Sequence, residues 1–282
     1  MLEIAIASGK GGTGKTTLST NLARVLSASH AVSYVDCDVE APNGGLFLQP
    51  RIDQRIPVYR PVPKVDESRC DFCGECSGFC QYNAIAVLKE RVIVFPELCH
   101  GCGGCLMVCP RDAISERQQP IGVVELGEAG SVAFAAGRLR IGETATVRLI
   151  RELRERARKA EITILDAPPG TSCPVVTSVY GVDVVVLVTE PTPFGLHDLR
   201  VAVETMRKLG IPMGVVVNRA GIGDNRVEEY CRREEVPIWG RIPDERQVAE
   251  AYSRGELASE VLPEFRERIE AIAGRLLQEV AA

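Results

Sequence analysis

The sequence contains no uninterrupted apolar run long enough to cross a bilayer, although 45% of its 282 residues are hydrophobic. A transmembrane helix needs about 20 consecutive apolar residues, so we expect no membrane span. The chain also lacks a strong net charge, because the formal value of −5 at pH 7 provides no general attraction to nucleic acid. We expect no signal peptide, since the N-terminus leads directly into a short apolar run and a glycine-rich loop.

Cysteine, by contrast, is abundant. Of eleven cysteines, eight lie in two tight clusters between Cys70 and Cys109. In a chain without an export signal, such spacing indicates metal ligation rather than disulfides. We therefore expect a cytoplasmic protein whose thiols stay reduced.

The glycine-rich loop after the first apolar run carries two lysines. Its spacing, Gly9-x-x-x-x-Gly14-Lys15-Thr16, fits a phosphate-binding loop between a strand and a helix. Glycines let successive backbone N–H groups turn toward an anion, and the helix N-terminus adds a positive dipole end. Lys15 would reach the β- and γ-phosphates, and the Thr16 hydroxyl would ligate Mg²⁺. The loop therefore predicts nucleotide binding, whereas a merely structural turn would not explain Lys10 beside Lys15.

Apolar strands that alternate with helices predict an α/β fold with a mostly parallel sheet covered by helices on both faces. Ligands in such folds bind at the carboxyl ends of the strands. The loop, Asp38 and Asp166 all fall there. We expect helices over residues 143–160, 195–209, 225–234, 244–254 and 263–282. The last helix should dock on the domain through Phe265, Ile269, Ile272, Leu276 and Val280.

Between the second strand and the cysteines, the composition changes. A polar loop over residues 39–45 precedes a passage with Pro50, Pro57, Pro61 and Pro63, which is typical of a linker. We therefore predict a main domain formed by residues 1–62 and 119–282, with a small α+β domain inserted at residues 63–118.

The cysteine segment is an internal repeat. Its two runs are Cys70-x-x-Cys73-x-x-Cys76-x-x-x-Cys80 and Cys99-x-x-Cys102-x-x-Cys105-x-x-x-Cys109, and every cysteine recurs 29 residues later (99 − 70). This pattern resembles the bacterial ferredoxins with two [4Fe–4S] clusters, in which the fourth cysteine of each run ligates the other cluster. The resemblance implies one cluster on Cys70, Cys73, Cys76 and Cys109, and a second cluster on Cys99, Cys102, Cys105 and Cys80.

Structural zinc sites are the alternative for these cysteines. Zinc prefers two separated Cys-x-x-Cys pairs in a tetrahedral cage. Three cysteines at successive spacings of three, with a remote fourth, suit a four-iron cluster better. The repeat departs only at Gln81, which stands where the second run has Pro110, and neither is a ligand.

The loop also carries an extra lysine, Lys10, in the form Lys-Gly-Gly-x-Gly-Lys-Thr-Thr. This form resembles the deviant Walker A motif of the MinD, Mrp and ParA ATPases and of the nitrogenase iron protein. The likeness extends to Asp36-Cys-Asp38 as switch I, to residues 165–170 as Walker B and switch II, and to residues 188–198. Asn218-Arg219 falls where that family places its adenine-reading asparagine.

The resemblance implies an ATP and Mg²⁺ site. Asp166 would support the Mg²⁺ shell through water, and Asp38, also near that shell, would orient the attacking water. Lys10 would reach the nucleotide of a partner subunit and, with Lys15, stabilise transition-state charge, which implies an ATP-bridged homodimer. The implied nucleotide-binding residues are Gly9, Lys10, Gly11, Gly12, Thr13, Gly14, Lys15, Thr16, Thr17, Asn218 and Arg219.

Several residues have structural alternatives. Lys10 could be a solvated loop lysine, and Asp36 could cap the switch loop without touching Mg²⁺. For His197 and Asp198 we favour a packed imidazole and a helix-start cap over catalytic roles. Cys173 lies seven residues after Asp166, as a cluster-ligating cysteine does in the nitrogenase iron protein.

The second ligand of that bridging cluster has no counterpart here, since residues 126–163 contain no cysteine. We therefore favour a buried or interface thiol for Cys173. Cys37 and Cys231 should be ordinary buried cysteines.

Three functions follow as hypotheses. The first is an ATP-driven switch that controls electron transfer through the ferredoxin module to a redox partner. The second is an iron–sulfur cluster carrier or assembly ATPase that acts on an iron–sulfur protein. The third is a regulatory ATPase of the MinD and ParA type, with the clusters as a redox sensor.

Overall fold

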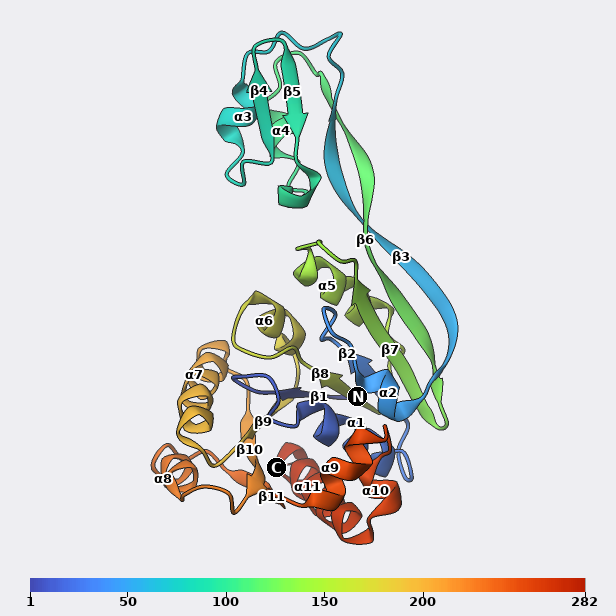
Figure 1. Ribbon diagram of the computed structural model, residues 1–282, viewed down its shortest axis with the longest axis vertical. Coiled ribbons are helices and arrows are strands. Elements are labelled where there is room, and N and C mark those ends of the chain that lie inside the picture. Colours follow the sequence, from blue (N-terminus) through green and yellow to red (C-terminus); the bar gives the residue numbers. More distant parts are fainter. Residues whose placement is uncertain (282) are drawn as a thin grey trace. The chain divides into compact units, whose positions relative to one another are not determined.

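The structure is a computed structural model that describes residues 1–281. The chain divides into two compact units (Figure 1). The larger unit contains Met1–Arg55, Val124–Arg138 and Ile150–Ala282, and the smaller contains Ile56–Val123 and Leu139–Leu149. The smaller unit thus includes more of the chain than the insert predicted at residues 63–118.

A nine-stranded sheet has the strand order β11-β10-β9-β1-β8-β2-β7-β6-β3. The strands are β1 (Leu2–Ala7), β2 (Val32–Asp36), β3 (Arg51–Val65), β6 (Ile114–Ala129), β7 (Val132–Leu139), β8 (Ile162–Asp166), β9 (Val184–Thr189), β10 (Met213–Ala220) and β11 (Ile238–Pro243). All neighbours from β11 to β7 pair in parallel. The predicted α/β fold with a mostly parallel sheet is confirmed.

Helices connect these strands. They are α1 (Lys15–Leu26), α2 (Gly44–Leu48), α5 (Thr146–Arg156), α6 (Cys173–Val179), α7 (Pro193–Leu209), α8 (Arg226–Arg233), α9 (Arg246–Ser253), α10 (Ala258–Val261) and α11 (Pro263–Ala281). Helix α5 is shorter than the predicted 143–160, and the short helices α2, α6 and α10 were not predicted. None of the helices in residues 1–281 combines the length and apolar character of a membrane span.

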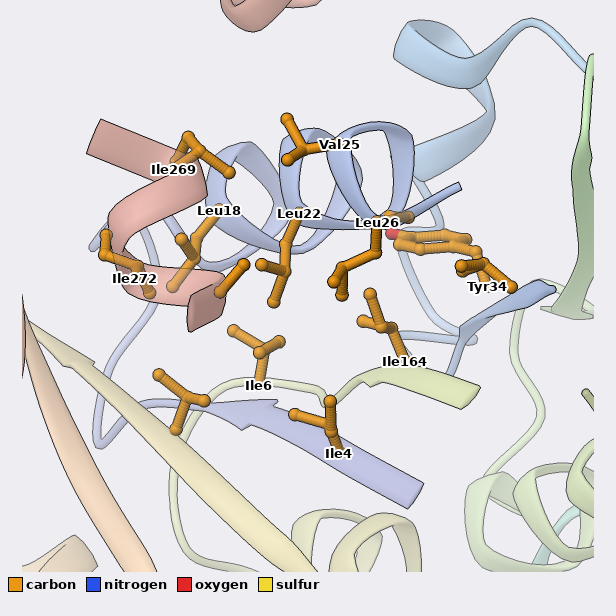
Figure 2. Packing of buried hydrophobic residues seen from close by; sticks show 14 of the residues in the cluster. Ile4, Ile6, Leu18, Leu22, Val25, Leu26, Tyr34, Ile164, Ile269 and Ile272 are labelled. Carbon is orange, nitrogen blue, oxygen red and sulfur yellow. The ribbon is translucent and has the colours of Figure 1, made fainter. Parts of the chain in front are cut away.

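The core of the larger unit lies between β1, α1 and α11. Figure 2 shows Ile4 and Ile6 of β1 facing Leu18 and Leu22 of α1, with α11 beside them. Four of the five predicted docking residues of α11 are fully buried: Phe265, Ile269, Ile272 and Leu276. Each contributes roughly 1.5–3 kcal/mol relative to exposure, so α11 is firmly docked. The prediction is wrong only for Val280, which is 37% exposed.

The proline-rich passage is not a linker. It forms the 15-residue strand β3, which lies at the edge of the sheet. An edge strand tolerates Pro57, Pro61 and Pro63, because a proline without an N–H can face the side that has no neighbouring strand. The prolines therefore marked a boundary region correctly, but the prediction that this region is a linker is wrong, because it is a strand.

The smaller unit repeats its backbone along the cysteine segment. Helices α3 (Glu75–Phe79) and α4 (Gly104–Met107) begin 29 residues apart (104 − 75). Strands β4 (Ile85–Leu88) and β5 (Arg91–Val94) form an antiparallel pair, and a 3₁₀ turn, Pro96–Leu98, follows them. A buried ion pair joins Arg60 to Glu143 at 2.9 Å.

Candidate functional site

The carboxyl ends of neighbouring strands meet at a cavity of about 410 Å³ in the larger unit. The phosphate-binding loop follows β1, Asp38 follows β2, and Asp166 ends β8. Eight of the predicted nucleotide-binding residues line the cavity: Gly11, Gly12, Gly14, Lys15, Thr16, Thr17, Asn218 and Arg219. Gly9, Lys10 and Thr13 lie outside its lining.

The loop owes its shape to glycine. Gly12 and Gly14 adopt positive φ angles of 78° and 95°, which a side chain would strain. Gly14 is the N-cap of α1, and no side chain caps that helix end. The first N–H groups of α1 therefore remain available to an anion.

Lys15 and Asp38 line this cavity, and the buried Asp166 carboxylate acts on both of them. Burial lowers the pKa of Lys15, against the opposing attraction of Asp166 and Asp38. Burial and the charge of Asp166 raise the pKa of Asp38 to about 6. Burial also raises the pKa of Asp166. Buried carboxylates in this state are stabilised by a divalent cation, which offsets their repulsion.

The surroundings of the Asp166 carboxylate show whether this site is suited to magnesium. Its Oδ2 accepts a hydrogen bond from the Tyr34 hydroxyl at 2.9 Å. Its Oδ1 is buried and accepts no hydrogen bond of good geometry among the described residues, although the Thr16 and Ser19 hydroxyls lie close enough to lower the pKa of Asp166. A buried carboxylate oxygen that is only weakly hydrogen-bonded is stabilised by a ligand such as metal-bound water. Together with the nearby Thr16 hydroxyl, Asp166 therefore fits a magnesium shell.

Asp36 has the capping role that was its structural alternative. Its Oδ2 accepts the Gly44 N–H at 2.9 Å, and its Oδ1 accepts the Asp38 N–H at 3.2 Å. Both carboxylate oxygens are therefore engaged by the loop that follows β2.

Asn218 holds the phosphate-binding loop from the side. Its Nδ2 donates to the Thr13 carbonyl at 2.8 Å. A Cβ added at Gly14 would lie 2.2 Å from the same Nδ2, so the amide packs directly against the loop. Asn218 lines the cavity and also supports its wall.

Lys10 is not a free loop lysine. Its Nζ lies 3.1 Å from Oε2 of Glu190, and Nη1 of Arg219 lies 3.0 Å from Oε1 of the same carboxylate. The Glu190 side chain is 7% exposed, so a buried carboxylate joins two residues that were predicted from separate motifs.

The expectations for His197 and Asp198 were wrong in detail. The side chain of Thr192 caps α7 by accepting the Gly195 N–H at 3.0 Å, and His197 is exposed in that helix. Asp198 instead packs against the loop, since a Cβ at Gly9 would lie 2.4 Å from the Asp198 carbonyl oxygen.

Two further cavities lie in the smaller unit, and each is lined by four of the eight clustered cysteines. One is lined by Cys70, Cys73, Cys76 and Cys109. The other is lined by Cys80, Cys99, Cys102 and Cys105. Each set combines three cysteines of one run with the fourth cysteine of the other run.

Backbone N–H groups point at the sulfur atoms in a repeated pattern. Sγ of the first cysteine in each run accepts from the residue two positions later: Phe72 to Cys70 and Gly101 to Cys99, both at 3.4 Å. Sγ of the fourth cysteine accepts from the residue four positions later: Ala84 to Cys80 at 3.4 Å and Ala113 to Cys109 at 3.3 Å. N–H donors favour thiolate over thiol, as a metal cluster requires.

A structural zinc ion needs four ligands in a tetrahedral cage, with Zn–S distances of about 2.3 Å. Among residues 1–281, no group of three or more histidine, cysteine, aspartate or glutamate side chains could hold one metal ion. The donors present therefore fit a larger inorganic group better than zinc.

The other cysteines differ in exposure. Cys37 and Cys231 are buried, as predicted. Cys173 is exposed at the first position of α6. Of the two alternatives predicted for Cys173, burial within one subunit is excluded, and a position at a subunit interface stays a prediction.

Comparisons with known proteins identify the family of the domain that contains this site. The family model for the CobQ/CobB/MinD/ParA nucleotide binding domain matches residues 4–258. The chain belongs to this family. A protein of Methanocaldococcus jannaschii named uncharacterized protein MJ0579 is 30% identical to this CobQ/CobB/MinD/ParA family member over 265 residues, 91% of either chain.

The chain is also similar to a second curated protein and to a solved structure. An iron-sulfur cluster carrier protein of Pyrococcus horikoshii is 26% identical over 270 residues, covering 90% of this chain and 77% of the relative. The structure of the septum site-determining protein MinD with Mg-ADP, from the same organism, has a TM-score of 0.61 and 19% identity. That match covers 98% of this chain and 95% of MinD, and it shows the fold alone.

Tyr34 and Glu190 are the site residues that sequence reasoning missed. Tyr34 lies in the middle of β2, and Glu190 directly follows β9. A polar residue inside or just after an otherwise apolar strand of a CobQ/CobB/MinD/ParA domain was the available signal for both.

Proposed function

We propose that the protein is an ATP-binding and ATP-hydrolysing dimeric switch that controls electron transfer through two [4Fe–4S] clusters. The observation that carries the proposal is the division of eight cysteines into two cavities. Each cavity has four cysteines, and each takes its fourth from the other run. Within one chain, a nucleotide-binding loop and two such cavities connect phosphoryl transfer with redox chemistry.

For the nucleotide, the roles follow from the geometry of the cavity. The N–H groups of the loop and Lys15 would hold the phosphates. Thr16 and Asp166 would hold the magnesium shell, since the Thr16 hydroxyl lies beside the Asp166 carboxylate. Mg-ATP supplies the γ-phosphoryl group and the metal charge. Asp38, whose pKa is raised to about 6, lines the cavity where it can orient the attacking water.

For the clusters, the roles follow from the two cysteine sets. Cys70, Cys73, Cys76 and Cys109 would hold one cluster, and Cys80, Cys99, Cys102 and Cys105 the other. The clusters supply one-electron redox chemistry. Full cysteine ligation and N–H donors to sulfur keep such a group bound and tune its potential.

Homodimerisation is part of the proposal. Lys10 would leave Glu190 and approach the nucleotide of a second subunit, adding a cation at the moment of phosphoryl transfer. The cysteine segment lies between the switch residues Asp38 and Asp166 in the chain. A nucleotide-dependent movement of these residues would therefore pass along the connected backbone to the cysteine segment.

The test is anaerobic reconstitution of the full chain with iron and sulfide, followed by iron analysis and measurement of Mg-ATP hydrolysis. The proposal predicts about eight iron atoms per chain and hydrolysis that Lys15→Ala abolishes. Cys231→Ser is a control for the iron content. It changes a buried cysteine outside both cavities and should retain the iron. Binding of zinc alone, or hydrolysis unaffected by Lys15→Ala, would contradict the proposal.

A second candidate is an iron–sulfur cluster carrier. It is favoured by the similarity to the iron-sulfur cluster carrier protein of Pyrococcus horikoshii and by the exposure of Cys173, which is accessible for a bridging cluster. Incubation of the reconstituted protein with an apo-ferredoxin tests it. Transfer that is lost in Cys173→Ser would support a carrier, whereas retention of all the iron would exclude it.

A further inference from the structure

A buried tyrosine connects Asp166 to the beginning of helix α2. Tyr34 lies in the middle of β2 with 0% of its surface exposed. Figure 2 shows its ring at the end of the core that includes Ile164, its register partner on β8. The hydroxyl donates to Oδ2 of Asp166 at 2.9 Å. One end of this side chain is therefore fixed to the carboxylate that fits the magnesium shell.

The same hydroxyl lies against the first residue of α2. A Cβ added at Gly44 would be 2.2 Å from the Tyr34 hydroxyl oxygen and 2.6 Å from its Cε1. The Gly44 N–H donates to Asp36 at 2.9 Å. Gly44 is therefore held on one side by a carboxylate and packed on the other against the phenol, and only glycine fits there.

The ring of Tyr34 also contacts β7, a strand that follows the cysteine-rich passage in the chain. It stacks on Phe134 of β7, with centroids 5.9 Å apart and planes 16° apart. A Cβ at Gly45 would lie 3.4 Å from the same Phe134 ring. Helix α2 precedes β3 in the chain, and β7 follows β6, so the Tyr34–Phe134 stack contacts the segments on both sides of the cysteine-rich passage.

We propose that Tyr34 is a positioning residue that fixes the Asp166 carboxylate for the magnesium shell and seats the first turn of helix α2. The assignment rests on the proposed Mg-ATP function. Since the phenol donates to Oδ2, a water of the magnesium shell would be held by Oδ1, on the carboxylate that the Thr16 and Ser19 hydroxyls also approach. When a cation binds and Asp166 shifts, the Tyr34 hydroxyl moves with it. The hydroxyl then presses directly on the backbone of Gly44, because glycine has no side chain that could adjust.

Tyr34→Phe separates this role from simple packing. The substitution keeps the ring and its stack on Phe134 but removes the one hydrogen bond to Oδ2. Loss of a hydrogen bond to a charged group predicts that about tenfold more Mg²⁺ is needed for tight nucleotide binding. Nucleotide affinity measured in EDTA should not change. Tyr180→Phe is the matched control, because the Tyr180 ring is 72% exposed.

The test combines Mg²⁺ titrations of nucleotide binding with hydrogen exchange of the full-length protein. In the wild type, Mg-ATP should change the exchange of the amides of residues 44–48, and Tyr34→Phe should lose that change at saturating Mg-ATP. Gly44→Ala, which forces a Cβ onto the hydroxyl, should perturb the same amides and the same Mg²⁺ dependence.

Two results would overturn the assignment. If Tyr34→Phe retains the wild-type Mg²⁺ dependence and exchange change, Tyr34 is only a core residue. If the wild type itself binds no Mg-ATP, the proposed function fails and the assignment fails with it. The first result leaves the proposed function intact, so the two failures are distinguishable.

Discussion

Nζ of Lys10 lies 3.1 Å from Oε2 of Glu190, within a single chain. Arg219 pairs with the other oxygen of this buried carboxylate at 3.0 Å. The lysine that distinguishes this loop from an ordinary phosphate-binding loop is therefore paired in the monomer. An ATP-bridged dimer must exchange this ion pair for contact with a second nucleotide.

Lys10→Met should separate dimerisation from folding. Because the Lys10 side chain is 33% exposed, loss of its ion pair should cost less than about 1 kcal/mol of unfolding free energy. Light scattering should show an ATP-dependent dimer for the wild type and only monomer for the variant. Lys208→Met, which breaks an exposed pair with Glu204, is the matched control and should dimerise normally. A Lys10→Met protein that still dimerises with ATP would contradict the role of Lys10.

Asp38 should make the nucleotide-free protein less stable as pH rises. The pKa of Asp38 is about 6 in the folded state and 3.8 ordinarily, so the folded state binds more protons between these values. The free energy of unfolding therefore decreases as pH rises through this window.

Asp38→Asn removes this dependence. Urea unfolding in EDTA should show the variant about 1 kcal/mol more stable than the wild type at pH 7.5, a value reduced for the partial exposure of Asp38. Near pH 4 the two proteins should be equally stable. Equal stability at both pH values would show that Asp38 is not destabilised by its surroundings, and hydrolysis by the variant would remove its proposed catalytic role.

A variant at Cys80 tests whether the fourth cysteine of each run ligates the cluster of the other run. Although Cys80 belongs to the first run, it lines the cavity of Cys99, Cys102 and Cys105. Cys80→Ala should therefore retain about four of about eight iron atoms per chain. The electron paramagnetic resonance spectrum of its remaining cluster should match that of Cys99→Ala and differ from that of Cys70→Ala. A Cys80→Ala spectrum that matches Cys70→Ala would mean that each run holds its own cluster.

Gly14 should be needed for more than its backbone conformation. Gly14→Ala strains a φ of 95° and also drives a Cβ to within 2.2 Å of Asn218. The backbone strain alone costs about 1–3 kcal/mol. Gly210→Ala strains a φ of 68° with open space around the new Cβ, so it measures that cost by itself.

Nucleotide binding distinguishes these two glycine variants. Gly210→Ala should lower the melting temperature and bind nucleotide normally, whereas Gly14→Ala should lose binding. Asn218→Ala, which loses the hydrogen bond to Thr13, should bind more weakly than the wild type but better than Gly14→Ala. Normal binding by Gly14→Ala would show that the loop does not hold the phosphates.

Local pattern was enough to predict the sheet class and the positions of Lys15, Asp38 and Asp166 at strand ends. Strand, loop and helix follow one another within a few residues, so their physics is local. The contact between Lys10 and Glu190 joins residues 180 positions apart (190 − 10), and no local pattern encodes such a contact. Tyr34 was missed for the same reason, because its partners Gly44, Phe134 and Asp166 come from other elements.

The long strand β3 shows a different limit. Its prolines disfavour a central strand but not an edge strand, and edge position depends on the order of all nine strands. Helix α2, with only five residues and two glycines, has too weak a propensity to be recognised from its sequence.

The most direct test of the central claim is an anaerobic redox titration of the reconstituted protein, with and without Mg-ATP. If the nucleotide controls electron transfer, the midpoint potential of at least one cluster should shift when Mg-ATP binds, and Lys15→Ala should abolish the shift. Titration curves that superimpose for both clusters, in wild-type protein shown to be saturated with Mg-ATP, would contradict nucleotide control of electron transfer.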